Sequence, residues 1–391
     1  MSAFEKLQVR GKRVLLRLDL NVPLNKRKVA DATRILAALP TINSLRDRGA
    51  KLVICSHLGR PKAQSVPALS LEPVAAWLAE HLDTEVVFAH ETVGEDVEFL
   101  SKDLQPGGIL VVENLRFHKG EKSGDPEFAK QLARLADVYV NDAFGVLHRE
   151  HASVVGVGQF LEEKALGPLI QREVDALDRL VKGAVKPFVG ILGGAKVSDK
   201  IGVMQSLLER CDAVLIGGAM AYTFLLAQGQ ATGKSLVEPD RIRLAKRLMD
   251  DAAKRGVKIL LPVDHIAVGP DSESPTVVED LGTDMVGFDI GPQTASNYAE
   301  IISRANSIFW NGPMGMFEKD AFAGGTKAVA EALAGSRAYS VVGGGDSAAA
   351  INKMGLADKV SHISTGGGAS LQYMEGNGLP GLQALGARRK Q

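Results

Sequence analysis

Short apolar segments alternate with amphipathic, helix-forming segments along this chain, and the alternation occurs twice. One series of strand-like runs ends before residue 150, and a second series begins after residue 185. Runs rich in Val, Ile and Leu are typical of strands buried on both faces by crossover helices in parallel sheets. At 391 residues the chain exceeds the usual size of one core. We therefore expect two α/β domains, each with a doubly wound parallel sheet.

The pattern assigns each expected element to a range of residues. In the first half we expect strands at 13–19, 51–56, 84–88, 108–113 and 137–141, and helices at 33–48, 71–82 and 125–136. In the second half we expect strands at 187–192, 213–218, 257–262, 307–312, 338–344 and 360–365.

The segment 161–183 has few β-branched residues and helical apolar spacing, so it predicts a long helix between the domains. Residues 376–391 are irregular and too short to form an element of either sheet. The predicted division is a first domain at 1–160, a helix at 161–183, a second domain at 184–375, and a tail at 376–391 that returns to the first domain.

Composition excludes several classes of partner. The formal net charge is zero, with 46 basic and 46 acidic residues, so no broad basic field is available for nucleic acid or anionic membranes. The N-terminal residues lack an apolar signal region, and no window reaches the roughly 20 apolar residues of a membrane span. Cys55 and Cys211 both adjoin strand-like runs, which favours buried, reduced thiols. These features predict a cytoplasmic protein.

Basic residues gather near the expected strand ends of the first half. In open parallel sheets, ligands bind outside the carboxyl ends of the strands. Arginine grips phosphate and carboxylate groups in bidentate fashion, so this set predicts an anion site, although any one of the arginines alone would be interpreted as a solvated surface residue. The basic residues concerned are Arg17, Arg34, His57, Arg60, Arg116 and Arg149.

Two further polar features of the first half have alternative interpretations. Asp19 and Asn21 can hydrogen-bond ligand hydroxyls or form the turn before Pro23. His148 and His151 have H-x-x-H spacing but lack the usual third ligand of a zinc site, so we do not expect zinc there.

The second half carries two glycine loops, each placed after an expected strand and before a helix. In GGAKVSDK (193–200), glycine lets backbone N–H groups approach phosphate oxygens at the helix start. Lys196 and Lys200 are four residues apart and would share a face of a helix; the alternative is an ordinary turn with two exposed lysines. In GGGDSAAA (343–350), Asp346 would repel a bare pyrophosphate, so it fits a Mg²⁺ ion bridging to nucleotide phosphates.

Two other nucleotide motifs compete with these loops. Gly343, Gly345 and Ala348 match the weak dinucleotide pattern G-x-G-x-x-A. The segment 229–235 ends like a Walker A loop, but its glycine spacing is one residue short and it follows a helical run, so we reject it.

Taken together, the motifs resemble the bacterial form of the phosphoglycerate kinase family. They include RLDLNVP, SHLGRPK, ENLRFHKGE, NDAFG with HREHAS, GGAKVSDK, WNGPMGMFE, GGGDS and STGGGAS, in family order over essentially the whole chain. The resemblance implies two Rossmann-like domains joined by a hinge helix. It implies reversible transfer of a phosphoryl group between 1,3-bisphosphoglycerate and Mg-ADP, giving 3-phosphoglycerate and Mg-ATP. It also implies a monomer whose ligands are small molecules. The departures, at Leu18, Leu20 and Ser347, touch no charged role.

The resemblance also implies roles for particular residues. The first domain would bind the triose through Asp19, Asn21, Arg34, His57, Arg60, Arg116 and Arg149. The second would bind the nucleotide through Gly193, Gly194, Lys200, Asn311, Glu318, Gly343, Gly344, Gly345 and Asp346. Asp346 would contact magnesium and Glu318 the ribose, and Arg34, Lys196 and Lys200 would act in catalysis.

Phosphoryl transfer of this kind needs positioning and charge neutralisation, and the attacking carboxylate or phosphate is already ionised, so no general base is expected. Because an acyl phosphate is prone to hydrolysis, exclusion of water by domain closure is expected. One alternative is a dinucleotide-dependent oxidoreductase, but the expected strand 360–365 offers no acidic residue for the ribose. Another is an anion-binding or regulatory protein that has kept the fold.

Overall fold

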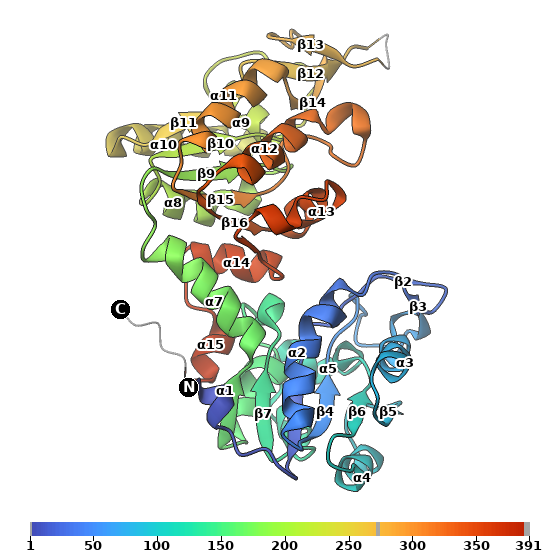
Figure 1. Ribbon diagram of the computed structural model, residues 1–391. Coiled ribbons are helices and arrows are strands. Elements are labelled where there is room, and N and C mark those ends of the chain that lie inside the picture. Colours follow the sequence, from blue (N-terminus) through green and yellow to red (C-terminus); the bar gives the residue numbers. More distant parts are fainter. Residues whose placement is uncertain (1, 271–273, 387–391) are drawn as a thin grey trace. The chain divides into compact units, whose positions relative to one another are not determined.

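The computed structural model describes residues 2–270 and 274–386, and the chain divides into two compact units. The first unit comprises the chain up to Val174 together with the segment that begins at Gly378, and the second comprises Asp175–Asn377. Each unit contains a six-stranded sheet with helices around it (Figure 1). The predicted α/β class with two parallel-sheet domains is confirmed.

The sheet of the first unit has the order β5-β6-β4-β1-β7-β8, and all its neighbouring strands are parallel. Its strands are β1 (Arg13–Arg17), β4 (Lys51–Cys55), β5 (Val86–Ala89), β6 (Ile109–Val112), β7 (Val138–Asn141) and β8 (Glu163–Leu166). The helices are α1 (Ala3–Lys6), α2 (Thr33–Asp47), α3 (Glu72–His81), α4 (Glu95–Asp103), α5 (Lys119–Ser123), α6 (Pro126–Ala133) and α15 (Pro380–Ala384). The chain moves from β1 to one side of the sheet and later crosses to the other, so a topological switch point lies beside β1.

Both faces of this sheet are buried. On β1, the side chain of Leu16 packs in a cluster with Ile42 of α2 and Val74 of α3. Its neighbour Leu15 belongs to a second cluster, which contains Phe128 of α6 and residues of α4. Successive residues of a strand point to opposite faces, so a continuous apolar run is what a doubly covered strand requires.

The sheet of the second unit has the order β11-β10-β9-β15-β16-β17 and is also parallel throughout. Its strands are β9 (Phe188–Leu192), β10 (Ala213–Ile216), β11 (Lys258–Leu260), β15 (Ser307–Asn311), β16 (Tyr339–Gly343) and β17 (His362–Ile363). The helices are α8 (Ile201–Leu208), α9 (Met220–Ala227), α10 (Ile242–Arg255), α11 (Pro292–Ser303), α12 (Gly324–Gly335), α13 (Gly345–Lys353) and α14 (Gly367–Met374). The switch point lies between β9 and β15, where strands from the two halves of the sheet are neighbours.

The prediction of one helix over 161–183 is wrong in its first part. Residues Glu163–Leu166 form β8, which pairs with β7 at the edge of the sheet. The helix, α7 (Pro168–Val181), begins only after Gly167. Only Ala165 of β8 is fully buried, so this edge strand carries almost no apolar signal in the sequence. The boundary of the two units falls within α7, after Val174.

Several small elements have no counterpart in the prediction. An antiparallel sheet of the second unit contains β12 (His265–Val268), β13 (Thr276–Val278) and β14 (Val286–Ile290), in the order β13-β12-β14. A two-stranded hairpin of the first unit contains β2 (Leu24–Asn25) and β3 (Lys28–Val29). The helix α4 is also absent from the prediction. Short strands with exposed residues lack the continuous apolar run that predicts the parallel strands.

The last described segment is a short helix and not the irregular stretch predicted. In α15, the backbone N–H of Gly381 donates to the carbonyl of Leu147 at 2.9 Å, and Leu382 is buried. These contacts attach the segment to the first unit, and no strand of either sheet comes from it among the residues described.

Candidate active site

In the first unit, three strand ends meet at the switch point. Arg17, the last residue of β1, is in register with Cys55 of β4 on one side and with Asn141 of β7 on the other. The residues that follow these strands, including Asp19 and His57, therefore lie along one edge of the sheet.

Asp19 and Asn21 form contacts that join the loop after β1 to neighbouring segments at this edge. Oδ1 of Asp19 lies 3.0 Å from Nη1 of Arg34, which is the second residue of α2. The side-chain oxygen of Asn21 accepts a hydrogen bond from the N–H of Gly59 at 2.7 Å. The two side chains thus have structural contacts and are also only partly buried, so the turn-forming and ligand-binding interpretations of the sequence are compatible.

Arg116 is a buried cation with an unused donor. It lies in a short 3₁₀ helix, η2 (Leu115–Phe117), whose start is capped by the side chain of Asn114 at 3.1 Å from the Arg116 N–H. Its Nη1 donates to the carbonyl of Gly59 at 2.6 Å, but its Nε is buried without a partner. Burial, followed by the charges of Arg149 and Arg17, lowers the pKa of Arg116 to about 10. The negative charge of an anion placed here would act to raise this pKa and so oppose both effects.

Arg149 shows the same pattern. Its Nε is also buried without a partner, and its pKa is lowered by burial and by the nearby charge of Arg60. Arg60 itself is exposed. The carboxylates that act on Arg116 are Glu121 and Asp19, so the arginines outnumber the acidic groups beside them. This excess of positive charge is suited to a ligand with more than one negative charge.

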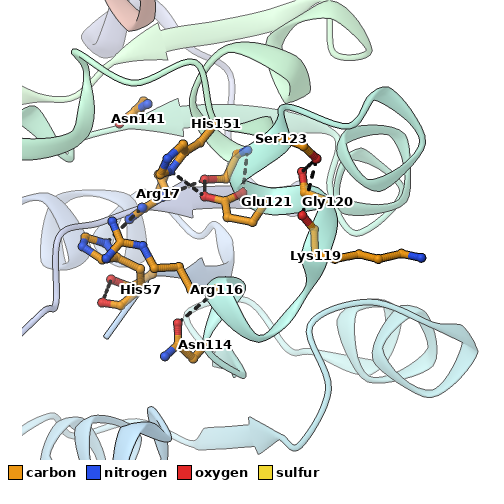
Figure 2. Close-up of polar contacts among 12 residues, drawn as sticks. Arg17, His57, Asn114, Arg116, Lys119, Gly120, Glu121, Ser123, Asn141 and His151 are labelled. Carbon is orange, nitrogen blue, oxygen red and sulfur yellow. Dashed lines mark hydrogen bonds and ion pairs between the residues drawn. The ribbon is translucent and has the colours of Figure 1, made fainter. Parts of the chain in front are cut away.

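His57 lies inside the arginine cluster and is almost fully buried, with 4% of its surface exposed. Burial lowers its pKa well below the usual value, and the charges of Arg17, Arg116, Arg149 and Arg34 lower it further. His57 is therefore neutral at physiological pH. Figure 2 shows Arg17, His57 and Arg116 in one group of polar side chains.

In the second unit, two glycines meet at the switch point. Gly193 follows β9 and Gly312 follows β15, and the N–H of Gly193 donates to the carbonyl of Asn311 at 2.9 Å. A Cβ atom on Gly193 would lie 2.1 Å from the carbonyl oxygen of Pro313, and one on Gly312 would lie 2.2 Å from the Gly193 oxygen. Only glycine permits this approach of the two loops, which leaves the edge of the sheet lined by backbone.

Asn311 connects the lysine loop to the loop at 343–346. Its Oδ1 accepts a hydrogen bond from Nζ of Lys200, and its Nδ2 donates to the carbonyl of Gly343 at 2.8 Å. Asn311 is completely buried, whereas Lys200 is half-buried at the end of the 3₁₀ helix η6 (Ser198–Lys200). Burial lowers the pKa of Lys200, while Asp199 and Asp346 act to raise it.

The loop of Gly343 to Asp346 leads from β16 into α13. Gly344 has φ of +94°, and a Cβ there would lie 2.8 Å from Nδ2 of Asn311, so the position requires glycine. Asp346 is exposed in the first turn of α13. Ser347 Oγ accepts a hydrogen bond from the N–H of Gly312 at 2.6 Å, which joins this loop to the glycine contact described above.

Of the two interpretations of this segment, the one in which Lys196 and Lys200 share a helix face is wrong. The alternative, an ordinary turn with two exposed lysines, holds for Lys196 only, because Lys200 is half-buried. Lys196 lies in the loop before η6, and α8 begins only at Ile201. The loop is fixed by Ser198, whose N–H and Oγ donate to Glu238 at 3.1 and 2.6 Å. The helix starts later than expected because two glycines and this side-chain contact replace the first helical turn.

Lys196 and Glu318 are exposed and form no hydrogen bond or ion pair with other described residues. Within residues 2–270 and 274–386, no group of three or more His, Cys, Asp or Glu side chains could hold a metal ion. The exposed carboxylate of Asp346 lies in the first turn of α13, and carboxylate oxygen is a ligand type that is chemically compatible with Mg²⁺.

The sequence patterns indicate no role for Glu121 or Ser153. Both are completely buried, and Ser153 Oγ donates to Glu121 Oε1 at 2.7 Å. The sequence predicts that Arg17 grips an anion, but its guanidinium is fully buried and donates to protein groups. Glu121 ends the motif ENLRFHKGE and Ser153 ends HREHAS, but nothing in the sequence itself indicates that either residue is buried.

Comparisons with known proteins agree with these features. The family model described as phosphoglycerate kinase matches residues 4–377. The phosphoglycerate kinase of Clostridium novyi (strain NT) is 51% identical over 388 residues, covering 97% of each chain. That of Koribacter versatilis (strain Ellin345) is 50% identical over 396 residues, covering 98% of each.

Solved structures give the same result. The phosphoglycerate kinase of Coxiella burnetii matches with a TM-score of 0.88 and 40% identity over 99% of each chain. That of Pyrococcus horikoshii OT3 matches with a TM-score of 0.87 and 36% identity over 99% of each chain. Across the described residues, no helix has the length and apolar character needed to cross a membrane. On the extent of these matches, the chain belongs to the phosphoglycerate kinase family.

Proposed function

We propose that the arginine cluster of the first unit binds the triose substrate and that the glycine loops of the second unit bind the nucleotide. The chain is a phosphoglycerate kinase, and its reaction is the glycolytic transfer of a phosphoryl group between 1,3-bisphosphoglycerate and ADP.

The observation that carries the triose assignment is the pair of buried guanidinium Nε atoms, on Arg116 and Arg149, that have no partner. A buried donor without a partner is costly, and a charged one more so, so these groups favour a bound anion. 3-Phosphoglycerate has a carboxylate and a phosphate, which together match an excess of arginine. The proposed triose ligands are Asp19, Asn21, Arg34, His57, Arg60, Arg116 and Arg149.

The nucleotide assignment is supported by the contact of Lys200 with Asn311 and by the backbone of two glycine loops. Helix α13 begins in the second loop, and its free N–H groups favour phosphate oxygens. We propose that Asp346 contacts the magnesium ion of the nucleotide and that Glu318 hydrogen-bonds the ribose. The full proposed set is Gly193, Gly194, Lys200, Asn311, Glu318, Gly343, Gly344, Gly345 and Asp346.

The chemistry requires orientation and neutralisation of charge. A bound Mg²⁺ would neutralise phosphate oxygens. Arg34, Lys196 and Lys200 would stabilise negative charge on the phosphoryl group as it transfers. The acceptor carboxylate and the nucleotide phosphate are ionised at neutral pH, so neutral His57 is not needed as a base. We also propose a cytoplasmic location, since Cys55 and Cys211 are both buried and unpaired, as in a reducing compartment. The resemblance to the family is the basis for proposing a monomer.

Two exposed residues allow the assignment to be tested with little risk to folding. Arg60→Ala should weaken binding of 3-phosphoglycerate by about tenfold or more, because hydrogen bonds to charged groups contribute about 1.5–3 kcal/mol. It should leave the affinity for Mg-ADP unchanged. Glu318→Ala should do the reverse. Calorimetric titration of the full chain with each ligand measures both affinities.

Matched controls are Arg27→Ala in the first unit and Glu300→Ala in the second. Each is an exposed residue in a surface ion pair outside the proposed sites. The controls should bind both ligands normally. Loss of Mg-ADP affinity in Arg60→Ala, or loss of 3-phosphoglycerate affinity in Glu318→Ala, would contradict the division of roles.

A further inference from the structure

Arg17 is a fully buried cation that forms no ion pair with a carboxylate among the described residues. Its Nε donates to Oγ of Ser153 at 3.0 Å, and its Nη1 donates to the carbonyl of Leu18. Its Nη2 lies 3.2 Å from Nδ1 of His57. All three guanidinium nitrogens are thus engaged inside the protein, and one of them contacts a proposed substrate ligand.

Glu121 carries the negative charge that compensates Arg17, and the side chain of Ser153 lies between the two. The N–H of Ser153 donates to Oε2 of Glu121 at 3.0 Å, and its hydroxyl donates to Oε1 at 2.7 Å. Nδ1 of His151 lies 3.5 Å from the same Oε1 (Figure 2). Burial acts to raise the pKa of Glu121, but His151, Arg17 and Ser153 outweigh it and lower the pKa, so the carboxyl group is ionised.

The chemistry of these groups fixes the direction of every hydrogen bond. A carboxylate only accepts, so the one hydroxyl proton of Ser153 points to Glu121 and an oxygen lone pair faces Arg17. A guanidinium only donates, so Nδ1 of His57 accepts from Arg17. A neutral imidazole with an accepting Nδ1 carries its proton on Nε2.

We propose that Glu121 and Ser153 are positioning residues which act through Arg17 to hold His57 as the neutral tautomer with its proton on Nε2. Among the described residues, Nε2 of His57 donates to no protein group, so its N–H is available to an anionic ligand. This inference rests on the proposed function, in which His57 faces the triose. It adds a reason why His57 donates to the ligand instead of presenting a lone pair to it.

The alternative tautomer would have a clear cost. With the proton on Nδ1, the imidazole would direct that proton at Arg17 and a lone pair at the negatively charged ligand. The hydrogen bond from Arg17 would be lost, and the ring would repel both the guanidinium and the ligand. The contacts from Glu121 through Ser153 to Arg17 exclude this tautomer. They therefore favour binding of the triose although neither Glu121 nor Ser153 contacts it.

A positioning role of Glu121 and a purely electrostatic role predict opposite changes in the affinity for 3-phosphoglycerate when Glu121 is removed. Removal of an acidic residue from a cationic cluster strengthens anion binding if charge alone matters. Positioning predicts the opposite, because loss of Glu121 releases Ser153 and Arg17. Glu121→Gln should therefore raise the KM for 3-phosphoglycerate, and a fall in KM would overturn the proposal.

The direct test is the imidazole ¹⁵N spectrum of His57 in the full chain without ligands, assigned by its loss in His57→Gln. The spectrum reports which ring nitrogen carries the proton. We expect a single neutral form at pH 7, protonated on Nε2. A charged ring, or a proton on Nδ1, would overturn the proposal independently of any substrate.

Ser153→Ala leaves every charge in place and removes only the bridging hydroxyl. We expect a mixture of His57 tautomers and a roughly three- to tenfold higher KM for 3-phosphoglycerate, the effect of one weakened hydrogen bond, with kcat within about twofold of wild type. Ser101→Ala is the matched control, since Ser101 is also fully buried and accepts from an arginine, Arg13, at 3.4 Å. It should leave the spectrum and KM unchanged.

The outcomes separate this inference from the proposed function. If Ser153→Ala is folded and retains the wild-type tautomer and KM, the positioning of His57 by Glu121 and Ser153 is refuted while the triose assignment stands. If the wild-type tautomer is found as expected but His57→Gln binds 3-phosphoglycerate normally, the placement of the triose at His57 is refuted. Thermal unfolding of each variant verifies that it is folded.

Discussion

Asp19 and Arg34 form an ion pair, with Oδ1 of Asp19 and Nη1 of Arg34 3.0 Å apart. The pair joins the loop after β1 to the first turn of α2. The Arg34 side chain is 39% exposed, and ion pairs of this kind contribute only about 0.2–1 kcal/mol. The contact therefore orients the guanidinium but is weak enough for an anion to displace Asp19.

Arg34→Ala should reduce turnover strongly if this guanidinium stabilises the transferring phosphoryl group. Loss of an arginine that stabilises such a transition state costs roughly 10³ to 10⁵ in rate. Binding of 3-phosphoglycerate should weaken less than turnover, because the other arginines remain. Steady-state kinetics and calorimetric titration measure the two effects. A variant that retains more than about a tenth of normal turnover, a loss below ~1.4 kcal/mol, would refute this role.

Asp346→Asn should raise the magnesium concentration needed for half-maximal activity. The change keeps the size and an acceptor oxygen of the side chain but removes the charge that attracts the cation. Affinity for 3-phosphoglycerate should not change. The measurement is a magnesium titration of the initial rate, with exposed Asp251→Asn on α10 as the control. If the Asp346→Asn titration superimposes on that of wild type, Asp346 does not contact magnesium and only stabilises the start of α13.

Asp289 should make stability of the second unit depend on pH. Burial raises its pKa to about 7 from the usual 3.8, although the N–H groups of Gly325 and Ile290 act to lower it. Between these two values the folded protein keeps the proton and the unfolded chain releases it. The free energy of unfolding therefore falls as pH rises from about 4 to about 7, by on the order of a few kcal/mol, and changes no further from this group above that range.

Asp289→Asn removes this titration. Relative to wild type, the variant should become more stable as the pH of the comparison rises from about 5 to about 8. Urea unfolding at both values measures the difference. If that difference is the same at both pH values, the carboxyl group of Asp289 does not retain its proton in the folded state.

The strands were predictable where both faces are buried. The expected strands at 187–192 and 307–312 correspond to β9 (Phe188–Leu192) and β15 (Ser307–Asn311), because five successive buried residues leave a continuous apolar run. The edge strand β8 buries only Ala165 fully and has charged neighbours, so local sequence favoured a helix there. Pairing with β7 overrides that preference. This pairing joins segments that are distant in the sequence, so the local periodicity does not predict it.

The residue types near the strand ends were predictable, but their environments were not. Arginine at those positions indicates an anion site whether it is exposed, as Arg60 is, or buried, as Arg17 is. Nothing in the local sequence indicates that Glu121 is buried against Ser153, since polar residues in such a segment are usually solvated. Side-chain partners that are distant in the chain, more than 30 residues in this case, appear only in the folded protein.

The most direct test of the proposed function is the initial rate of ADP formation from Mg-ATP with and without 3-phosphoglycerate, with no dinucleotide present. We expect turnover of about 1–100 s⁻¹, as is usual for kinases, when both substrates are present, and negligible ADP formation when 3-phosphoglycerate is omitted. Equal rates of ADP formation with and without 3-phosphoglycerate, or no reaction in either case, would contradict it.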